Sequence, residues 1–156
     1  MANEFTEVCH PEPDGTFDML KLDHQLCFPL YASSRKIVSL YTPHLKELGL
    51  TYTQYLVFLV LWEKDHISVG DLCHRLYLDT GTVTPLLKKM EKEGYIKRIR
   101  KKEDERIVLI ILTDKGRSLR EKASVIPDRI GSTISLSEED AAKLYQLLYQ
   151  LLDLCT

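Results

Sequence analysis

Cys27 lies in HQLCFPLYASSRK, residues 24–36, directly before a Phe-Pro pair and a stretch with helical periodicity. A cysteine reacts with peroxides as the thiolate, and the start of a helix favours that form because its backbone N–H groups carry partial positive charge. An isolated cysteine on an apolar helix is otherwise a small buried hydrophobe. The pattern of residues leaves both interpretations of Cys27 open.

A second set of residues has the chemistry of a DNA contact. In DTGTVTPLLKK, residues 79–89, a glycine and small hydroxyl side chains open a predicted helix, so its backbone N–H groups can approach a phosphate. Lys88 follows on that helix and would neutralise phosphate charge. Asp104 and Arg106 lie at the tip of a predicted hairpin. We expect Arg106 to enter a narrow minor groove of the DNA, with its guanidinium held in place by the Asp104 carboxylate.

Charge is distributed unevenly along the chain. The net charge is −2, but residues 88–106 hold nine Lys/Arg and five Asp/Glu, which gives +4 there and −6 elsewhere. A local basic stripe is what phosphate binding requires, whatever the total charge.

The sequence lacks the residue patterns that metal binding and catalysis require. The cysteines at positions 9, 27, 73 and 155 form no Cys-x-x-Cys pair and have no histidine at zinc-ligand spacing. No Ser-His-Asp set, phosphate-binding loop or carboxylate pair is present. We therefore expect no metal, no cofactor and no enzyme, and we interpret Cys73 as a core residue.

The apolar pattern argues against a membrane protein. The longest apolar run, residues 55–62, is far shorter than the roughly 20 residues that span a bilayer. No basic leader precedes an apolar stretch with a small-residue cleavage site. We expect a cytoplasmic protein with no membrane partner, whose thiols are kept reduced.

The first elements are predicted from periodicity and turn residues. Residues 1–17 are acidic and aperiodic, which indicates a flexible N-terminal extension. A helix follows to about Tyr41, and Pro29 suits its first turn, which leaves Cys27 at its N-terminal edge. TPHLKELGL predicts a separate short helical turn that ends at Gly49.

Three further helices are predicted from residues that prefer the N-cap position. They start after Thr51 or Thr53, after Ser68, and after Asp79 or Thr80, and they end near Lys64, Tyr77 and Gly94. After Gly94 the periodicity of the apolar residues changes from helical to strand-like. YIKRIR and IVLIILT are therefore predicted to be strands joined by the polar turn KKEDER. Two short helices, a tight turn and a charged hairpin form a winged helix-turn-helix, in which a helix fits the major groove and the hairpin reaches the minor groove.

The C-terminal part is predicted to be helical. Thr113 caps a helix that reaches Pro127 or passes it with a kink, and Ser137 opens a last helix. A monomer of this size has few places to bury the apolar stripe of that last helix, which favours a homodimer. The stripe consists of Leu144, Leu147, Leu148, Leu151 and Leu152.

The motif DERIVLIILTDKG resembles the wing of the MarR family of winged-helix repressors, where Asp-x-Arg precedes a strand ending in Leu-Thr. The resemblance covers about residues 20–152. Within the family, QLCFPLYASSRKI, YLDTGTVTPLLKKMEKEGYIKR and KKEDER are similar to the organic hydroperoxide resistance regulators.

The resemblance implies a mostly α fold with a small β-hairpin wing, in which N- and C-terminal helices interlock in a homodimer. Residues 18–156 would form a single MarR-like domain, with dimerisation helices in 18–50 and 113–156 and a winged helix-turn-helix lobe in 51–112. Cys27 corresponds to the sensor cysteine, and Tyr41 and Tyr52 match two tyrosines that reach the thiolate from the partner subunit. The DNA-contacting positions correspond to Thr80, Gly81, Thr82, Thr84 and Lys88 on the recognition helix and Asp104 and Arg106 on the wing.

The function implied is a repressor that leaves a pseudo-palindromic operator on double-stranded DNA when an organic hydroperoxide oxidises Cys27 to a sulfenic acid. Relatives with a second, resolving cysteine carry it after the wing, but residues 118–135 hold none here. A low-molecular-weight thiol, Cys9 or Cys155 could take that role. Two alternatives stay open: a repressor released by a non-covalent aromatic ligand, and a thiol peroxidase.

Overall fold

The computed structural model describes residues 20–154, so the predicted extension, Cys9 and Cys155 lie outside the described residues. In chain order the elements are η1 Leu22–His24, α2 Cys27–Glu47, α3 Tyr52–Glu63, β1 Ile67–Ser68, α4 Val69–Leu76, α5 Thr80–Lys92, β2 Ile96–Lys101, β3 Asp104–Leu112, α6 Asp114–Ala123, α7 Ile126–Thr133 and α8 Glu138–Leu154. The predicted fold class, mostly helical with a small β wing, is confirmed.

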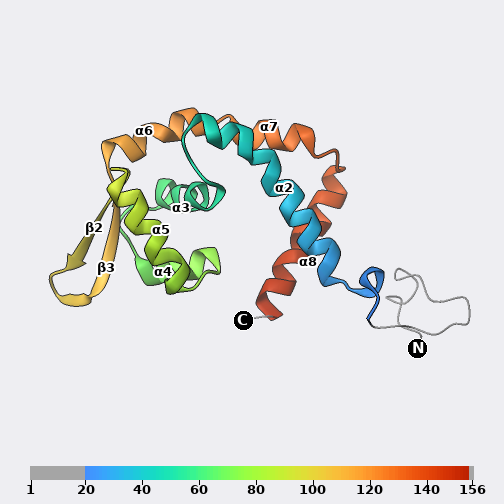
Figure 1. Ribbon diagram of the computed structural model, residues 1–156, viewed down its shortest axis with the longest axis horizontal. Coiled ribbons are helices and arrows are strands. Elements are labelled where there is room, and N and C mark those ends of the chain that lie inside the picture. The colour runs from blue at the N-terminus through green and yellow to red at the C-terminus, as the bar shows by residue number, and fades with distance from the viewer. Residues whose placement is uncertain (1–19, 155–156) are drawn as a thin grey trace, which may run out of the picture.

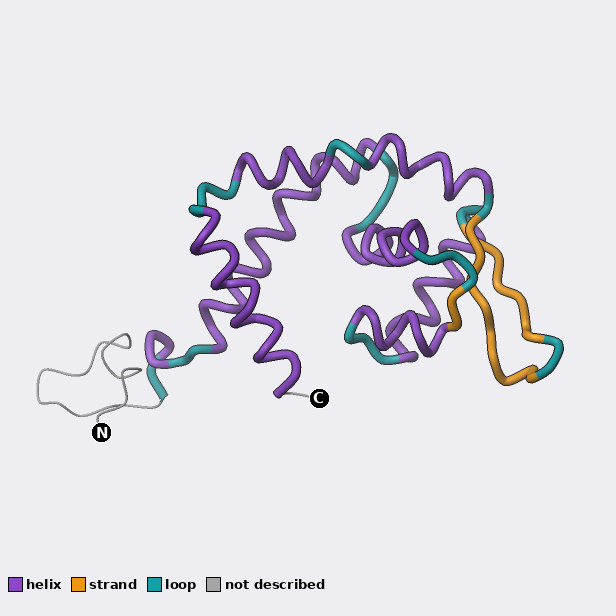
Figure 2. Tube along the Cα trace, turned by 180° about the vertical axis from the view of Figure 1, so that it is seen from behind, coloured by secondary structure: helices purple, strands orange, loops and turns teal. Residues whose placement is uncertain are grey.

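The elements form an arch (Figure 1). Helices α6 and α7 run across its top, the lobe with α3, α4, α5 and the β2–β3 hairpin lies at one end, and α2 and α8 descend at the other. Seen from behind, the hairpin projects beyond the helices of the lobe (Figure 2). The arrangement separates a winged lobe from two long helices.

Helix α2 is continuous over 21 residues, so the prediction of a break after Tyr41 was wrong. Pro43 lies inside the helix and removes one backbone donor, which is costly in isolation. The turn beyond it buries Leu45, which is 1% exposed, and this packing offsets the local cost. The helix ends as predicted at Gly49, whose φ is +69°, and the Leu50 N–H closes the end by donating to the Leu45 carbonyl at 2.9 Å.

Local capping sets the starts of the next three helices. Thr51 accepts from the backbone N–H of Gln54, and the Gln54 side chain accepts from the Thr51 N–H, so the first of the two predicted caps is used. Ser68 caps α4 and Asp79 caps α5, in agreement with the sequence. The helix-turn-helix is therefore fixed by short-range interactions.

The wing differs from the prediction in two respects. Its sheet has three strands in the order β1-β3-β2, because Ile67 and Ser68 pair with β3, and a strand of two residues leaves no periodic signal. The hairpin also continues through most of the expected turn, with Lys101 paired to Asp104. Backbone pairing does not need apolar side chains, so the charged residues of KKEDER extend the strands.

The arch joins the lobe at the start of α6. Thr113 caps α6 as predicted and also donates from its hydroxyl to the Gly94 carbonyl at 2.7 Å. A Cβ on Gly116 would overlap the Tyr95 carbonyl oxygen, so only glycine allows this close approach. Trp62 Nε1 donates to the Gly116 carbonyl at 3.0 Å. Helix α6 is thereby held against the lobe by both backbone and side chains.

The helix after the wing is interrupted near its proline. Helix α6 ends at Ala123, and α7 restarts with Pro127 in its first turn. A proline N atom carries no hydrogen for the Ala123 carbonyl, which accounts for the break. Neither expectation holds as stated: the helix ends before Pro127, and Pro127 lies in the first turn of a separate helix.

Helix α8 begins where Ser137 caps it, through an Asp140 N–H that donates to the Ser137 hydroxyl at 3.1 Å. None of its residues is buried within one chain. The large apolar residues exposed on it are Leu144, Tyr145, Leu147, Leu148, Tyr149, Leu151, Leu152 and Leu154. Such an extended apolar face is typical of an obligate subunit interface.

Asp65 joins the lobe to α6 and yields a stability prediction. Its Oδ1 accepts from the Leu112 N–H at 2.9 Å, and its Oδ2 accepts from Arg117 at 2.6 Å. Burial alone would raise the pKa of this carboxyl, but the backbone hydrogen bonds from Leu112 and His66 and the charge of Arg117 outweigh it and lower the pKa.

We expect Asp65→Asn to lower the free energy of unfolding by about 1–3 kcal/mol at pH 7, since it weakens bonds to a charged acceptor. Because the folded pKa lies below the ordinary value of 3.8, this contribution is present above that pH and is lost as pH falls through the folded value. Urea unfolding at fixed protein concentration measures both effects. Glu63→Gln, which breaks an exposed ion pair with Arg75, is the control and should change stability by less than about 1 kcal/mol.

Candidate functional site

Cys27 is the first residue of α2 and is exposed. Leu26 precedes it without a side-chain cap, and the first turn contains no acidic residue that would offset the positive helix end. Apolar side chains surround it in sequence, with Leu26, Phe28 and Leu30 between 37% and 46% exposed. The thiol is thus open to small molecules on a partly apolar surface at the N-terminal end of α2.

Tyr41 and Tyr52 come together at the junction of α2 and α3. Their ring centroids are 5.0 Å apart in an edge-to-face arrangement, although eleven positions separate them in the chain. Burial, and to a smaller extent the neighbouring Tyr41, raise the pKa of Tyr52. The Tyr52 phenol is therefore neutral at physiological pH and can donate a hydrogen bond.

Within one chain, Cys27 does not lie at this tyrosine pair. Cys27 and Tyr41 are on the same helix, fourteen residues apart. A rise of 1.5 Å per residue puts about 21 Å between them. The Cys27 thiol can reach these phenols only from a second chain, and the assignment of both tyrosines to the partner's Cys27 stays a prediction.

A third aromatic residue, Tyr55, belongs to the same cluster and was missed in the sequence. Its ring lies 5.9 Å from that of Tyr41, and the residue is 2% exposed. Burial, followed by the neighbouring tyrosines, raises the pKa of Tyr55 as well. Its position three residues after Tyr52, on the same face of α3, was the signal that could have identified it.

The start of α5 is built around Asp79. Its Oδ1 accepts from the Thr82 N–H at 2.8 Å and its Oδ2 accepts from the Thr82 hydroxyl at 2.7 Å, and these bonds lower the pKa of Asp79. A Cβ on Gly81 would lie 2.9 Å from the Asp79 carboxylate, so the turn is tight. Thr80, Gly81, Thr82 and Lys88 are exposed, and Thr84 is partly buried.

The wing and α5 enclose a groove of about 400 Å³ that brings Thr80, Thr84 and Arg106 together. Arg98 of β2 also lines it and was missed in the sequence; its Nε donates to Glu91 of α5 at 2.8 Å. This pair fixes the wing to the recognition helix. The surface presents hydroxyl and guanidinium groups, which suits a phosphate backbone.

The expected role of Asp104 needs correction. Its carboxylate accepts from the backbone N–H of Arg106 at 3.0 Å, and no ion pair with the Arg106 guanidinium occurs among the described residues. A side chain two positions away reaches the backbone more readily than the long guanidinium arm. Asp104 shapes the start of β3 and leaves Arg106 exposed.

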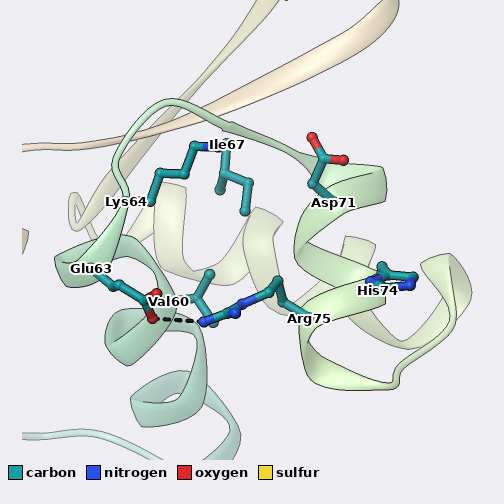
Figure 3. Close-up of a pocket in the computed structure, with 7 residues that line it drawn as sticks. All are labelled: Val60, Glu63, Lys64, Ile67, Asp71, His74 and Arg75. Carbon is teal, nitrogen blue, oxygen red and sulfur yellow. Dashed lines mark hydrogen bonds and ion pairs between the residues drawn. The ribbon is translucent and has the colours of Figure 1, made fainter. Parts of the chain in front are cut away.

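A separate pocket of about 290 Å³ lies between α3 and α4 (Figure 3). Glu63 and Arg75 face each other there at 2.7 Å, and none of the predicted site residues lines it. Within residues 20–154 no group of three His, Cys, Asp or Glu side chains could hold a metal ion. No helix of this described range is long and apolar enough to cross a membrane.

Comparison with known proteins assigns the family. The family described as transcriptional regulator SarA/Rot matches residues 39–123, more than half of the chain. The chain belongs to the SarA/Rot family of MarR-like winged-helix transcriptional regulators. Over 140 residues it is 49% identical to the organic hydroperoxide resistance transcriptional regulator of Bacillus subtilis, covering 90% of this chain and 95% of that protein. Regulators of this type are dimers, which agrees with the open apolar face of α8.

Two solved structures of AbfR, a Staphylococcus epidermidis protein, are similar in fold. Reduced AbfR bound to DNA is 36% identical, with a TM-score of 0.72 over 85% of this chain and 92% of that one. Disulfide-formed AbfR is 37% identical, with a TM-score of 0.60 over 84% of this chain and 92% of that one. The regulator described here is closer in shape to the reduced, DNA-bound form.

We predict that Lys88→Ala weakens binding to specific and random DNA by a similar factor. The slope of log affinity against log salt concentration should become shallower by about 1, because one phosphate contact is lost. Fluorescence anisotropy across a salt series measures the slope. Lys46→Ala, which removes an equal charge from α2 outside the lobe, should leave the slope unchanged, and an equal effect of both substitutions would contradict the assignment.

Proposed function

We propose that this protein is a transcriptional repressor that binds operator DNA, senses organic hydroperoxides by oxidation of Cys27, and leaves the operator when oxidised. One observation carries the proposal: an exposed cysteine begins α2, while a pair of phenols forms on the same chain at a place that Cys27 of that chain cannot reach. The dimer then completes two sensor sites. The relative in Bacillus subtilis, named for organic hydroperoxide resistance, supports the choice of effector.

The chemistry needs only the thiol and its partners. Phenol hydroxyls of Tyr41 and Tyr52 donate hydrogen bonds to the thiolate and stabilise it. The sulfur attacks one peroxide oxygen, the O–O bond breaks, and the departing alkoxide takes a proton to become an alcohol. Cys27 loses two electrons and becomes a sulfenic acid. A low-molecular-weight thiol then condenses with it, which releases water and leaves a mixed disulfide.

The apolar side chains beside the thiol give a preference among peroxides. Leu26, Phe28 and Leu30 are all partly exposed around Cys27. They favour an organic hydroperoxide over hydrogen peroxide, because the organic group gains by leaving water.

Oxidation replaces a hydrogen-bonded anion with a bulkier group, which breaks the link between Cys27 and the tyrosines of the other chain. The two lobes must meet successive major grooves about 34 Å apart, so a change in the dimer reaches the DNA-binding surface. A 100-fold loss of affinity corresponds to about 2.7 kcal/mol, comparable to two hydrogen bonds to a charged group. This chain is less similar to disulfide-formed AbfR (TM-score 0.60) than to reduced (0.72) or overoxidised (0.71) AbfR bound to DNA, which supports a change of shape on disulfide formation.

On DNA, we assign the major-groove contact to the start of α5 and the minor-groove contact to Arg106. The contacting residues in this proposal are Thr80, Gly81, Thr82, Thr84, Lys88 and Arg106, with Asp104 and Arg98 shaping the wing. The two-fold symmetry of a homodimer fits a pseudo-palindromic operator. A repressor of this kind works beside the chromosome, in the cytoplasm, and uses each hydroperoxide as a stoichiometric signal rather than as a substrate for turnover.

We expect Cys27→Ser to stay on operator DNA in cumene hydroperoxide, whereas the unmodified protein loses affinity about 100-fold. Gel shift or anisotropy with equimolar peroxide measures this. The control is Cys73→Ala, which should release normally, because Cys73 is buried and both desolvation and Asp79 raise its thiol pKa. Release of Cys27→Ser by the peroxide would rule out the sulfur as the sensor.

Intact mass spectrometry after equimolar hydroperoxide distinguishes a sensor from an enzyme. With a small thiol present, we expect one mixed disulfide per chain at Cys27 and no further peroxide consumption. Sustained consumption of hydroperoxide with a regenerating reductant would instead indicate a thiol peroxidase.

A further inference from the structure

Tyr55 stands between the two tyrosines of the sensor and the interior of the lobe. Its ring lies 5.9 Å from that of Tyr41 in α2 and 6.4 Å from that of Trp62, which follows seven residues, about two helical turns, further along α3. Tyr41 in turn meets Tyr52 at 5.0 Å. Tyr41 therefore rests on two tyrosines of α3, of which Tyr52 is partly exposed and Tyr55 is buried.

The support behind Tyr55 is rigid. Trp62 stacks on Phe58 with ring centroids 5.0 Å apart and an interplanar angle of 21°. The Trp62 indole N–H is also anchored, since it donates to the Gly116 carbonyl at 3.0 Å. Tyr55 cannot move toward the core without displacing this anchored pair, so it sets how deep and at what angle Tyr41 sits.

A phenol that serves a thiol in another chain needs such support. No bond of its own chain holds the Tyr41 hydroxyl among the described hydrogen bonds, so ring packing fixes its direction. A misplacement of about 1 Å in a reacting group can cost on the order of 100-fold in rate. Burial also keeps the Tyr52 and Tyr55 phenols protonated, because it raises the pKa of both.

We propose that Tyr55 is a positioning residue of the peroxide sensor, which holds the phenols of Tyr41 and Tyr52 in the orientation that meets Cys27 of the partner subunit. This inference rests on the proposed function. Tyr55 does not touch the thiol in this proposal and acts only through the ring of Tyr41, as a supporting residue behind a functional group.

The first experiment compares homodimers. Tyr55→Leu should slow the reaction of Cys27 with cumene hydroperoxide about 10-fold or more, while operator affinity of the reduced protein stays within about 2-fold. Tyr55→Phe keeps the ring and should restore most of the rate. Leu72→Ala is the control for stability, because it removes a fully buried side chain of the lobe from α4, outside the aromatic cluster. Equal slowing by Leu72→Ala and Tyr55→Leu would overturn the proposal, since both would then act through stability.

The second experiment uses mixed dimers, prepared with two affinity tags, and removes stability as an explanation. In one dimer, Cys27→Ser is on one chain and Tyr55→Leu on the other, so the remaining thiol meets intact tyrosines and should react at the normal rate. In the other dimer, one chain carries both substitutions and its partner is unmodified, so the remaining thiol meets the altered tyrosines and should react slowly. Each dimer contains one copy of each substitution.

The outcomes separate the two levels of the argument. Equal rates in the two mixed dimers, or the reverse order, would overturn the role of Tyr55 while leaving the sensor intact. Failure of the unmodified protein to react at Cys27 would instead overturn the proposed function. If Tyr55→Leu does not fold, Tyr55→Met fills a similar volume without a ring plane and carries the same expectation.

Discussion

The length and stiffness of α2 constrain everything proposed for this molecule. One uninterrupted helix has Cys27, the proposed sensor thiol, at its first residue and Tyr41 in its fourth turn, which keeps them about 21 Å apart in any single chain. Reactivity at Cys27 that depends on those phenols is consequently a property of the dimer. The same requirement ties oxidation to quaternary structure, because a modified thiol alters a contact between subunits rather than one within a fold.

In the proposed switch, a change in the dimer affects the DNA-binding surface because the winged lobe is firmly attached to α6. Asp65 bonds to Leu112 and Arg117, and Trp62 bonds to Gly116, so α3, β3 and α6 are held together at one point. In the proposed switch, the winged lobe would therefore move as a unit when the dimer changes. Coupling of this kind needs a change of only a few kcal/mol between two arrangements.

Features with local causes could be predicted from the sequence. The helix starts could be predicted from their N-cap residues, because an N-cap side chain bonds to a backbone N–H two or three residues away. These residues are Thr51, Ser68, Asp79, Thr113 and Ser137. The prediction failed where distant contacts decide. Helix α2 continues past Pro43 because the following turn buries Leu45. Ile67 and Ser68 form a strand because they pair with β3. The prediction also failed at one local contact, since the Asp104 carboxylate accepts from the Arg106 backbone N–H and does not pair with the Arg106 guanidinium.

By itself, the sequence determined the winged helix-turn-helix, the basic stripe and the candidate thiol, because periodicity, capping and charge are written in neighbouring residues. The tertiary structure alone decided that Tyr41, Tyr52 and Tyr55 form one cluster and that Cys27 lies outside it. It also decided that Arg98 joins the wing to α5. These relations depend on how α2, α3 and the sheet pack together. Packing brings together residues that are distant in the chain, and their spacing in the sequence does not indicate that they are in contact.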